Sequence, residues 1–330
     1  MENLIFSLNA TLPIFLLMVL GYIFNKIHLI DDKAASWMNK FVFKVALPLL
    51  VFQDLAEQDF MGTWNGKFVF FCFTATIVSI AVIALFSRLV IKDKSVRGEF
   101  IQGSYRSSAA LLGIAFIHNI YGEASTGMAP LMILGSVPLY NIFAVIILTL
   151  TAGAEVDAAG AGEESTTQSN EKRALMKKTL IGIITNPIII GILAGLLWSV
   201  LKIHEPKILK TTVTNLGSLA TPLGLMSMGA TFDFKKALGN AKVAFLASFI
   251  KLFVLVAVFM PIAVHMGFAG EQIVAILVML GSATTVSCYI MSKSMGHEGV
   301  LSSSIIMLTT FGCSFSLTFW LFILKSFGII

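Results

Sequence analysis

Polar residues that could bind an anion gather in two short stretches of an otherwise apolar chain. The first stretch, residues 102–113, contains Arg106, Ser107, Ser108 and Gly113. The second stretch, residues 281–287, supplies hydroxyl groups from Ser282, Thr284, Thr285 and Ser287. A guanidinium can grip a carboxylate through two parallel hydrogen bonds. Hydroxyl groups nearby can donate further hydrogen bonds to the same anion.

The segments that carry these residues are expected to cross a membrane. Hydrophobic residues make up 57% of the chain and charged residues only 12%, whereas soluble domains are about 25% charged. Apolar runs of about 20 residues recur along the whole length. Because lipid satisfies no backbone groups, each run should be a helix. The predicted spans are residues 4–25, 36–56, 67–90, 99–119, 127–151, 178–201, 209–231, 242–265, 271–293 and 300–327.

Lysine and arginine concentrate in alternate loops, which gives the expected orientation. Loops 26–35, 88–98, 152–177, 232–242 and 293–298 are rich in them. The opposite set of loops carries only Lys67, Lys202, Lys207, Lys210 and Lys325. The positive-inside rule then predicts a multi-pass protein of the cytoplasmic (inner) membrane with both termini outside. The net charge of +5 is thus a signal of topology, and we expect no nucleic-acid partner.

One polar segment divides the chain. Residues 152–170 are small, polar and acidic, with no aromatic side chain, so they cannot bury enough apolar surface to become ordered. We interpret residues 152–177 as a disordered cytoplasmic linker. It separates residues 1–151 from residues 178–330, and each part holds five predicted spans.

The two parts match at one fixed offset. Pro187 follows Pro13 by 174 residues (187 − 13), and Pro222 follows Pro48 by the same number. At this offset Gly21 also meets Gly195, and residues 108–109 meet residues 282–283, both Ser-Ala. Because five is an odd number of spans, the second copy enters the membrane from the opposite face. An inverted repeat of this kind is typical of secondary transporters.

The fourth and ninth spans correspond under this repeat and carry the two polar stretches. Ser107 lies about 13 Å into the fourth span at 1.5 Å per residue, and the ninth span places residues 281–287 at a similar depth from the other face. Glycine and hydroxyl residues there suit unwound helices whose positive N-terminal ends point at an anion. The alternative is a face of small residues that packs two helices together.

Three polar residues within the predicted spans could each have more than one role. Arg106 could bind a substrate carboxylate, snorkel to the surface or cap a helix. Lys251 could be a counter-charge for an anion, a stand-in for a coupling cation, or half of an ion pair. Asn141 follows Pro130 and Pro138 in the fifth span, where a distorted helix could place it on a cavity.

The sequence lacks the signals that are typical of several other classes of protein. No Asp or Glu is expected at the middle of the membrane, because Asp54, Glu57 and Asp59 fall at the outer end of the second span. A cation–proton exchanger would need a buried carboxylate. There is no Gly-rich phosphate loop and no His/Cys/Glu metal set. We therefore expect no enzyme activity, no cofactor and no metal.

The order of these features resembles the auxin efflux carrier family. The matching stretches are residues 220–230 (ATPLGLMSMGA), 281–285 (GSATT) and 111–114 (LLGI). The resemblance implies a scaffold of spans one, two, six and seven and a moving transport domain made of the other six. It implies that spans four and nine cross as broken helices, and that the cargo is an organic anion. Unlike the plant carriers, this chain has no proline at the crossing, where we expect Gly113 and Gly281 to take that role.

The sequence thus predicts an all-α polytopic membrane protein with ten transmembrane helices in a 5+5 inverted repeat. We expect a secondary transporter that moves a mono- or dicarboxylate such as malate or malonate by elevator-type alternating access. A proton or sodium ion could drive it, and a homodimer is left open. A cation–proton exchanger, or a membrane enzyme or sensor, remains the alternative. The expected substrate-binding residues are Arg106, Ser107, Ser108, Gly113, Asn141, Lys251, Ser282, Thr284, Thr285 and Ser287.

Overall fold

The computed structural model describes residues 2–57, 64–109, 116–117, 120–121, 128–159, 182 and 184–330. Within these ranges every regular element is a helix. Five helical stretches are long and apolar enough to cross a membrane, and three shorter apolar helices accompany them. The five stretches are Asp32–Ala56, Gly66–Val90, Met128–Thr151, Ala241–His265 and Val300–Ser326. The shorter helices are Leu12–Lys26, Pro187–Val200 and Glu271–Gly281. All eight fall within predicted spans or overlap them closely.

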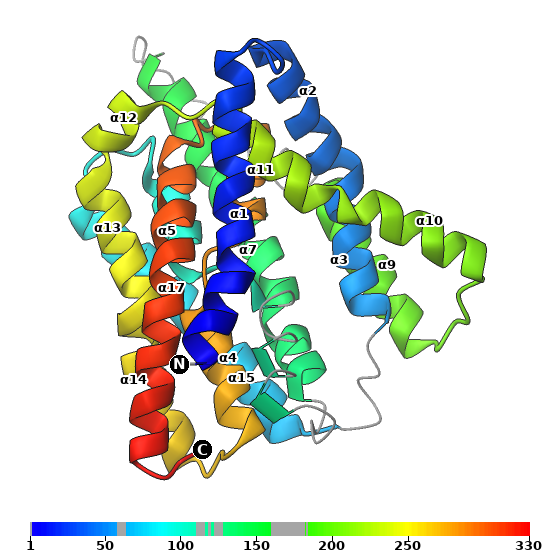
Figure 1. Ribbon diagram of the computed structural model, residues 1–330, viewed down its shortest axis with the longest axis vertical. Coiled ribbons are helices and arrows are strands. Elements are labelled where there is room, and N and C mark those ends of the chain that lie inside the picture. The colour runs from blue at the N-terminus through cyan, green and yellow to red at the C-terminus, as the bar shows by residue number, and fades with distance from the viewer. Residues whose placement is uncertain are drawn as a thin grey trace, which may run out of the picture.

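One group of helices packs around α1 and α3. Helix α1 lies along α11, and α3 lies along α9 and α10. A short π-helical turn, η1, joins α2 to α3 in one continuous rod. Figure 1 shows α9 and α10 at one edge of the molecule, far from α13 and α14 at the other. The members are α1 (Glu2–Lys26), α2 (Asp32–Phe41), η1 (Val42–Ala46), α3 (Leu47–Ala56), α9 (Pro187–Val200), α10 (Lys207–Ser218) and α11 (Ala220–Ala230).

Two helix pairs in this first group approach so closely that only glycine fits between them. A Cβ atom at Gly21 of α1 would lie 2.3 Å from the carbonyl oxygen of Met226 in α11. A Cβ atom at Gly195 of α9 would lie 2.7 Å from the carbonyl oxygen of Phe52 in α3. Small residues at crossings allow membrane helices to pack by backbone contact. Gly195 follows Gly21 by 174 residues, and Met226 follows Phe52 by the same 174.

The second group packs around α15, which is buried on all sides. Residues 273–279 of α15 are inaccessible to solvent, and the helix contacts α7, α14 and α17. Figure 1 shows α17 beside α1, where the two groups meet. The members are α4 (Gly66–Val90), α5 (Arg97–Tyr105), α7 (Met128–Ala159), α13 (Ala241–Phe249), η3 (Ile250–Val254), α14 (Leu255–His265), α15 (Glu271–Gly281), α16 (Ser287–Ser294) and α17 (Val300–Ser326). A short helix, α12 (Phe234–Gly239), precedes α13.

The described helices differ from the predicted spans at several ends. The seventh span is two helices, α10 and α11, that meet at Leu219. In the sixth span α9 begins at Pro187, because the side chain of Asn186 accepts the N–H of Ile188 at 3.0 Å and proline suits the first helical turn. The average hydropathy of a span does not predict where such a cap begins a helix.

The predicted linker begins as helix. Helix α7 continues to Ala159, beyond the boundary expected at residue 151. Residues 152–159 include four alanines and Glu155, which are good helix formers, so intrinsic propensity extends a helix that is already nucleated. The rest of the predicted linker, residues 160–177, lies outside the described residues.

Candidate functional site

The described part of the first polar stretch, residues 102–109, lies against the second polar stretch in the second helix group. Helix α5 ends at Tyr105, and Arg106 has an extended backbone with φ −67° and ψ 131°. Helix α15 ends at Gly281, Ser282 is extended with φ −76° and ψ 165°, and the chain becomes helical again at Ser287. The predicted fourth and ninth spans are therefore interrupted within their polar stretches.

Hydrogen bonds between the two interruptions satisfy backbone groups that the broken helices release. The Ser108 N–H donates to the carbonyl oxygen of Ala283 at 2.9 Å. The Thr284 hydroxyl donates to the carbonyl oxygen of Gly103 at 2.8 Å. A backbone N–H or C=O group that lacks a hydrogen bond inside a membrane is strongly unfavourable, because lipid cannot supply one. Each irregular segment therefore requires the other.

A cavity of about 280 Å³ opens at this contact and is bounded by both helix groups. One wall comes from α1, α3 and α11, and the other from α7, α17, the first residue of α16 and the two interruptions. The first wall consists of Ile14, Leu47, Leu50, Val51, Asp54 and Thr221. The second wall consists of Arg106, Ser107, Ser108, Ala109, Val137, Tyr140, Asn141, Ala283, Thr284, Thr285, Val286, Ser287 and Thr310.

Arg106 is the charged centre of the second wall. Its side chain is only 2% exposed, so it neither snorkels nor reaches a surface. Its Nη2 atom donates to Asn141 Oδ1 and Ser287 Oγ, both at 2.7 Å, and Nη1 donates to the Met291 sulfur at 2.8 Å. All three partners are neutral, and Nε has no partner among the described residues. Within the same ranges no carboxylate forms an ion pair with Arg106.

Neighbouring side chains fix the direction in which the Arg106 partners point. The Asn141 amide nitrogen donates to the carbonyl oxygen of Val137, one turn earlier in α7, at 3.0 Å. The amide oxygen is thereby turned toward Arg106. The Tyr140 hydroxyl donates to the carbonyl oxygen of Met279 at 3.1 Å, which ties α7 to the end of α15. The guanidinium is thus held in place before any ligand arrives.

Seven of the predicted site residues line the cavity together: Arg106, Ser107, Ser108, Asn141, Thr284, Thr285 and Ser287. Ser282 is not on the cavity wall; it is fully buried, and its hydroxyl has no partner in the described structure. Gly113 lies outside the described residues.

Lys251 lies behind the cavity wall. It is fully buried in η3, and its ammonium contacts the Ser107 hydroxyl and the end of α15. It is absent from the cavity lining, so direct contact with an anion is not its role in this conformation. Among the described residues no carboxylate forms an ion pair with it.

Asp54 is a carboxyl group on the cavity wall that the expected site did not include. Depth counted from the sequence places it at the outer end of its span, and it lines the same cavity as Arg106. The cavity extends along α3, where Leu47, Leu50, Val51 and Asp54 share one face at helical spacing. This i, i+3, i+4, i+7 pattern was the signal available in the sequence. Tyr140, Thr221 and Thr310 on the wall were also missed.

Buried polar residues on a cavity between two groups of membrane helices define the general class of an integral membrane protein with an internal site. The family described as "Membrane transport protein" matches residues 6–321. The chain therefore belongs to this family, which includes the auxin efflux carriers, and the resemblance seen in the sequence is confirmed. Membership favours transport over catalysis.

Three curated relatives have similar sequences. A protein named "Putative malonate transporter" from Rhizobium meliloti (strain 1021) is 24% identical over 322 residues, which cover 96% of each chain. Auxin efflux carrier component 8 of Arabidopsis thaliana is 26% identical over 172 residues, which are 50% of this chain and 46% of that protein. An uncharacterized transporter of Methanothermobacter thermautotrophicus is 20% identical over 315 residues, or 95% of this chain and 97% of that one.

Proposed function

We propose that this chain is a secondary transporter that moves a small organic anion, a mono- or dicarboxylate such as malonate or malate, across the cytoplasmic membrane. The observation that carries this proposal is Arg106, a buried guanidinium on a cavity wall whose described partners are all neutral. A buried charge without a counter-charge is strongly unfavourable. A substrate carboxylate would supply the missing charge and could use the unpartnered Nε.

The rest of the wall fits a small anion. Ser108, Thr285 and Ser287 line the cavity with Arg106, and each carries a hydroxyl group. Helix α16 begins at Ser287, so the positive end of its dipole lies at the same place. At about 280 Å³ the cavity is at the lower limit of ligand pockets, which span roughly 300–1,000 Å³ for drug-sized ligands. A three- or four-carbon acid fits this size better than a large aromatic one.

Paired contacts support a ten-span inverted repeat. Glu99, at the start of α5, accepts the N–H groups of Gly299 and Ser302 at the start of α17, at 2.9 and 2.7 Å. Glu271, at the start of α15, accepts the N–H of Met128 at the start of α7, at 2.8 Å. In the predicted repeat α5 corresponds to α15 and α7 to α17, so the two caps are equivalent.

The position of the cavity supports an elevator-type movement. Its first wall belongs to the group that would form the scaffold, and its second wall, with Arg106 and both interruptions, belongs to the group that would form the transport domain. If the second group slides along the first, the site is carried with it and opens to the other side. The close helix contacts at Gly21 and Gly195 join scaffold helices only, so they do not oppose such sliding.

Asp54 supports a proton as the coupling ion. A carboxylate on the scaffold wall repels an anion held by Arg106, whereas a protonated carboxyl group does not. Binding of an anion together with a proton would therefore be favoured over binding of the anion alone. Arg106 in the same cavity argues against a cation–proton exchanger, because its buried charge would repel the cation.

Uptake into proteoliposomes tests this function. Labelled malonate, malate and lactate are offered with imposed proton or sodium gradients. We expect uptake of at least one carboxylate, its loss in Arg106→Gln, and unchanged uptake in Arg88→Gln, which removes an exposed arginine of α4. If no carboxylate moves under any gradient the proposed function is wrong, and if Arg106→Gln transports normally the proposed site is wrong.

A further inference from the structure

The polar contacts of Lys251 are all with oxygen atoms, and no carboxylate of the described residues forms an ion pair with it. It belongs to the π-helical turn η3 between α13 and α14 and is fully buried. Its Nζ atom contacts the Ser107 hydroxyl, the carbonyl oxygen of Leu280 at 2.5 Å and that of Met279 at 3.5 Å. The site lies directly behind the wall that carries Arg106.

The hydrogen-bond partners around Nζ fit an ammonium group. The Ser107 hydroxyl donates its single proton to the carbonyl oxygen of Met279, so toward Lys251 it can only accept. The two carbonyl oxygens also only accept. An ammonium has three N–H donors for three acceptors, whereas a neutral amine would direct a lone pair at one of them.

Neither carbonyl group has a backbone partner within α15, because the helix stops at Gly281. The last carbonyls of a helix have no partner within the helix, and they form the negative end of its dipole. The ammonium therefore meets the C-terminal end of a broken helix at the point where the two interruptions contact each other. Carbonyl oxygens of unwound helices, joined by a hydroxyl, are also the ligands with which transporters bind Na⁺.

We propose that the Lys251 ammonium is a tethered cation that occupies what would otherwise be an alkali-cation site at the crossing. It supplies the positive charge that holds the end of α15 to Ser107 without an ion from solution. Transport should therefore not require Na⁺. The transport part of this inference rests on the anion carrier proposed above, whereas cation binding by the crossing does not.

Removal of the tether should expose the cation site. Lys251→Ser leaves an oxygen-lined space and adds one more oxygen ligand. Lys251→Met fills a similar volume without a charge and leaves no room for an ion. Thermal unfolding of the purified protein is measured in NaCl, KCl, LiCl and choline chloride at equal ionic strength, with no anion substrate present.

We expect the wild-type protein to unfold at one temperature in all four salts. Lys251→Ser should be less stable in choline chloride and regain roughly 2 °C or more, in a saturable manner, with at least one small cation. Lys251→Met should be destabilised equally in every salt. The proposal is overturned if Lys251→Ser shows no cation-specific gain, if it cannot be recovered folded in any alkali salt, or if the wild type itself is stabilised specifically by one cation.

The transport measurement separates this inference from the proposed function. Malonate uptake by the wild type should be the same in sodium and choline buffers, and Lys251→Ser should transport only when the stabilising cation is present. Sodium-dependent uptake by the wild type would overturn the tethered-cation role while supporting the carrier function. Cation-specific stabilisation of Lys251→Ser without any carboxylate uptake would support the cation site and overturn the carrier.

Discussion

At the scale of single residues, one basic and one acidic side chain face the same cavity from different helix groups. Arg106 belongs to the wall built from the interruptions, and Asp54 belongs to α3 on the other wall. Arg106 has hydrogen-bond partners but no described counter-ion. Glu57, one turn beyond Asp54, is already engaged by Lys210 at 2.8 Å. Among the described residues, Asp54 is therefore the carboxyl group available to a ligand in the cavity, and Arg106 is the available cation.

An internal counter-ion for Arg106 should compete with the substrate. Asn141→Asp places a carboxylate oxygen where Asn141 Oδ1 now accepts from Nη2 at 2.7 Å. A charged hydrogen bond contributes about 1.5–3 kcal/mol, so KM for malonate should rise about tenfold or more while the protein melts at the same or a higher temperature. Kinetics of uptake and thermal unfolding check this.

The matched control for that substitution is Asn215→Asp, on the exposed face of α10. It adds the same charge outside the cavity and should leave KM unchanged. An unaltered KM in Asn141→Asp would show that the anion does not use the charge of Arg106.

Asp54 should set the pH dependence of uptake. Protonation removes its negative charge from the anion cavity, so uptake by the wild type should increase as pH falls. Asp54→Asn is uncharged at every pH, so the ratio of its rate to the wild-type rate should be greatest at high pH and fall toward one as pH decreases. Taking this ratio cancels the titration of the substrate itself.

Glu57→Gln is the control for Asp54, because Glu57 directly follows α3 and is paired outside the cavity. Its uptake should still rise as pH falls, with a midpoint at lower pH than in the wild type, because the negative charge of Glu57 no longer acts on Asp54. Parallel profiles for Asp54→Asn and the wild type would remove Asp54 from proton coupling.

At the scale of helices, the sequence predicted where polar groups interrupt the membrane spans but not how each helix ends. The hydroxyl-rich stretches at 106–108 and 282–287 were visible because they violate the apolar pattern of a span. The placement of Asp54 and Lys251 was not, because it depends on which face of a rod turns to the cavity. The π-helical turn η3 contains Lys251 and changes the phase of the helix around it. Counting depth along a regular helix cannot register such a change.

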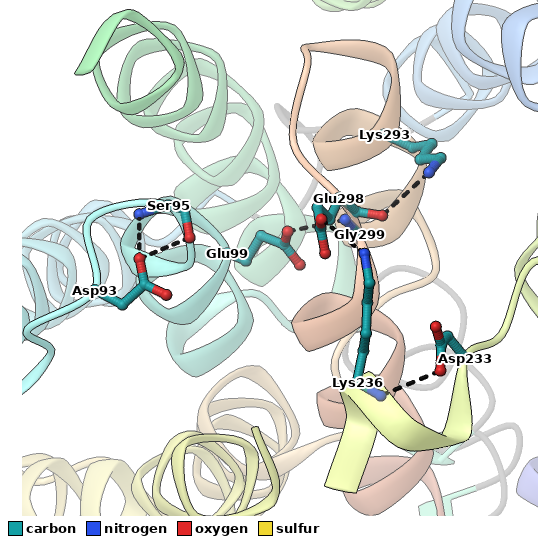
Figure 2. A network of polar contacts seen from close by, with 8 residues as sticks. All are labelled: Asp93, Ser95, Glu99, Asp233, Lys236, Lys293, Glu298 and Gly299. Carbon is teal, nitrogen blue, oxygen red and sulfur yellow. Dashed lines mark hydrogen bonds and ion pairs between the residues drawn. The ribbon is translucent and has the colours of Figure 1, made fainter. Parts of the chain in front are cut away.

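The cap that Glu99 provides for α17 should be important for stability. Figure 2 shows the Glu99 carboxylate directed at Gly299, near the exposed pair of Lys236 and Glu298. Glu99 is 1% exposed and accepts two backbone N–H groups. Glu99→Gln keeps the shape but loses the charge and one acceptor, which should cost about 1–2 kcal/mol. Thermal unfolding measures the loss.

The neighbouring Glu298→Gln provides the control for Glu99. Its hydrogen bond and charge raise the pKa of Lys236, but both side chains are mostly exposed, and water and salt screen such pairs. Its effect on the unfolding temperature should be clearly smaller than that of Glu99→Gln. Equal effects would mean that the backbone cap of α17 does not contribute more than a surface ion pair.

At the scale of the whole molecule, contacts of two kinds recur in pairs. Gly21 with Met226 and Gly195 with Phe52 join the helices of the first group. The Glu99 and Glu271 caps join those of the second. Each pair is related by the offset of the predicted repeat or nearly so, because Glu271 follows Glu99 by 172 residues. Each group is thus tied together internally by its own set of contacts, as the proposed elevator-type movement requires.

Movement of one group past the other should expose the same residue to both sides of the membrane in turn. Thr285→Cys places a thiol on the cavity wall, at a position that is partly accessible. The native Cys72, Cys288 and Cys313 are buried, so the parent chain supplies a low background. A membrane-impermeant maleimide should label Thr285→Cys in both right-side-out and inside-out vesicles. Malonate should slow the reaction from both sides because the anion covers the thiol. Labelling from a single side under every ligand condition would mean that the cavity does not alternate, and the elevator-type mechanism would then be wrong even if uptake is observed.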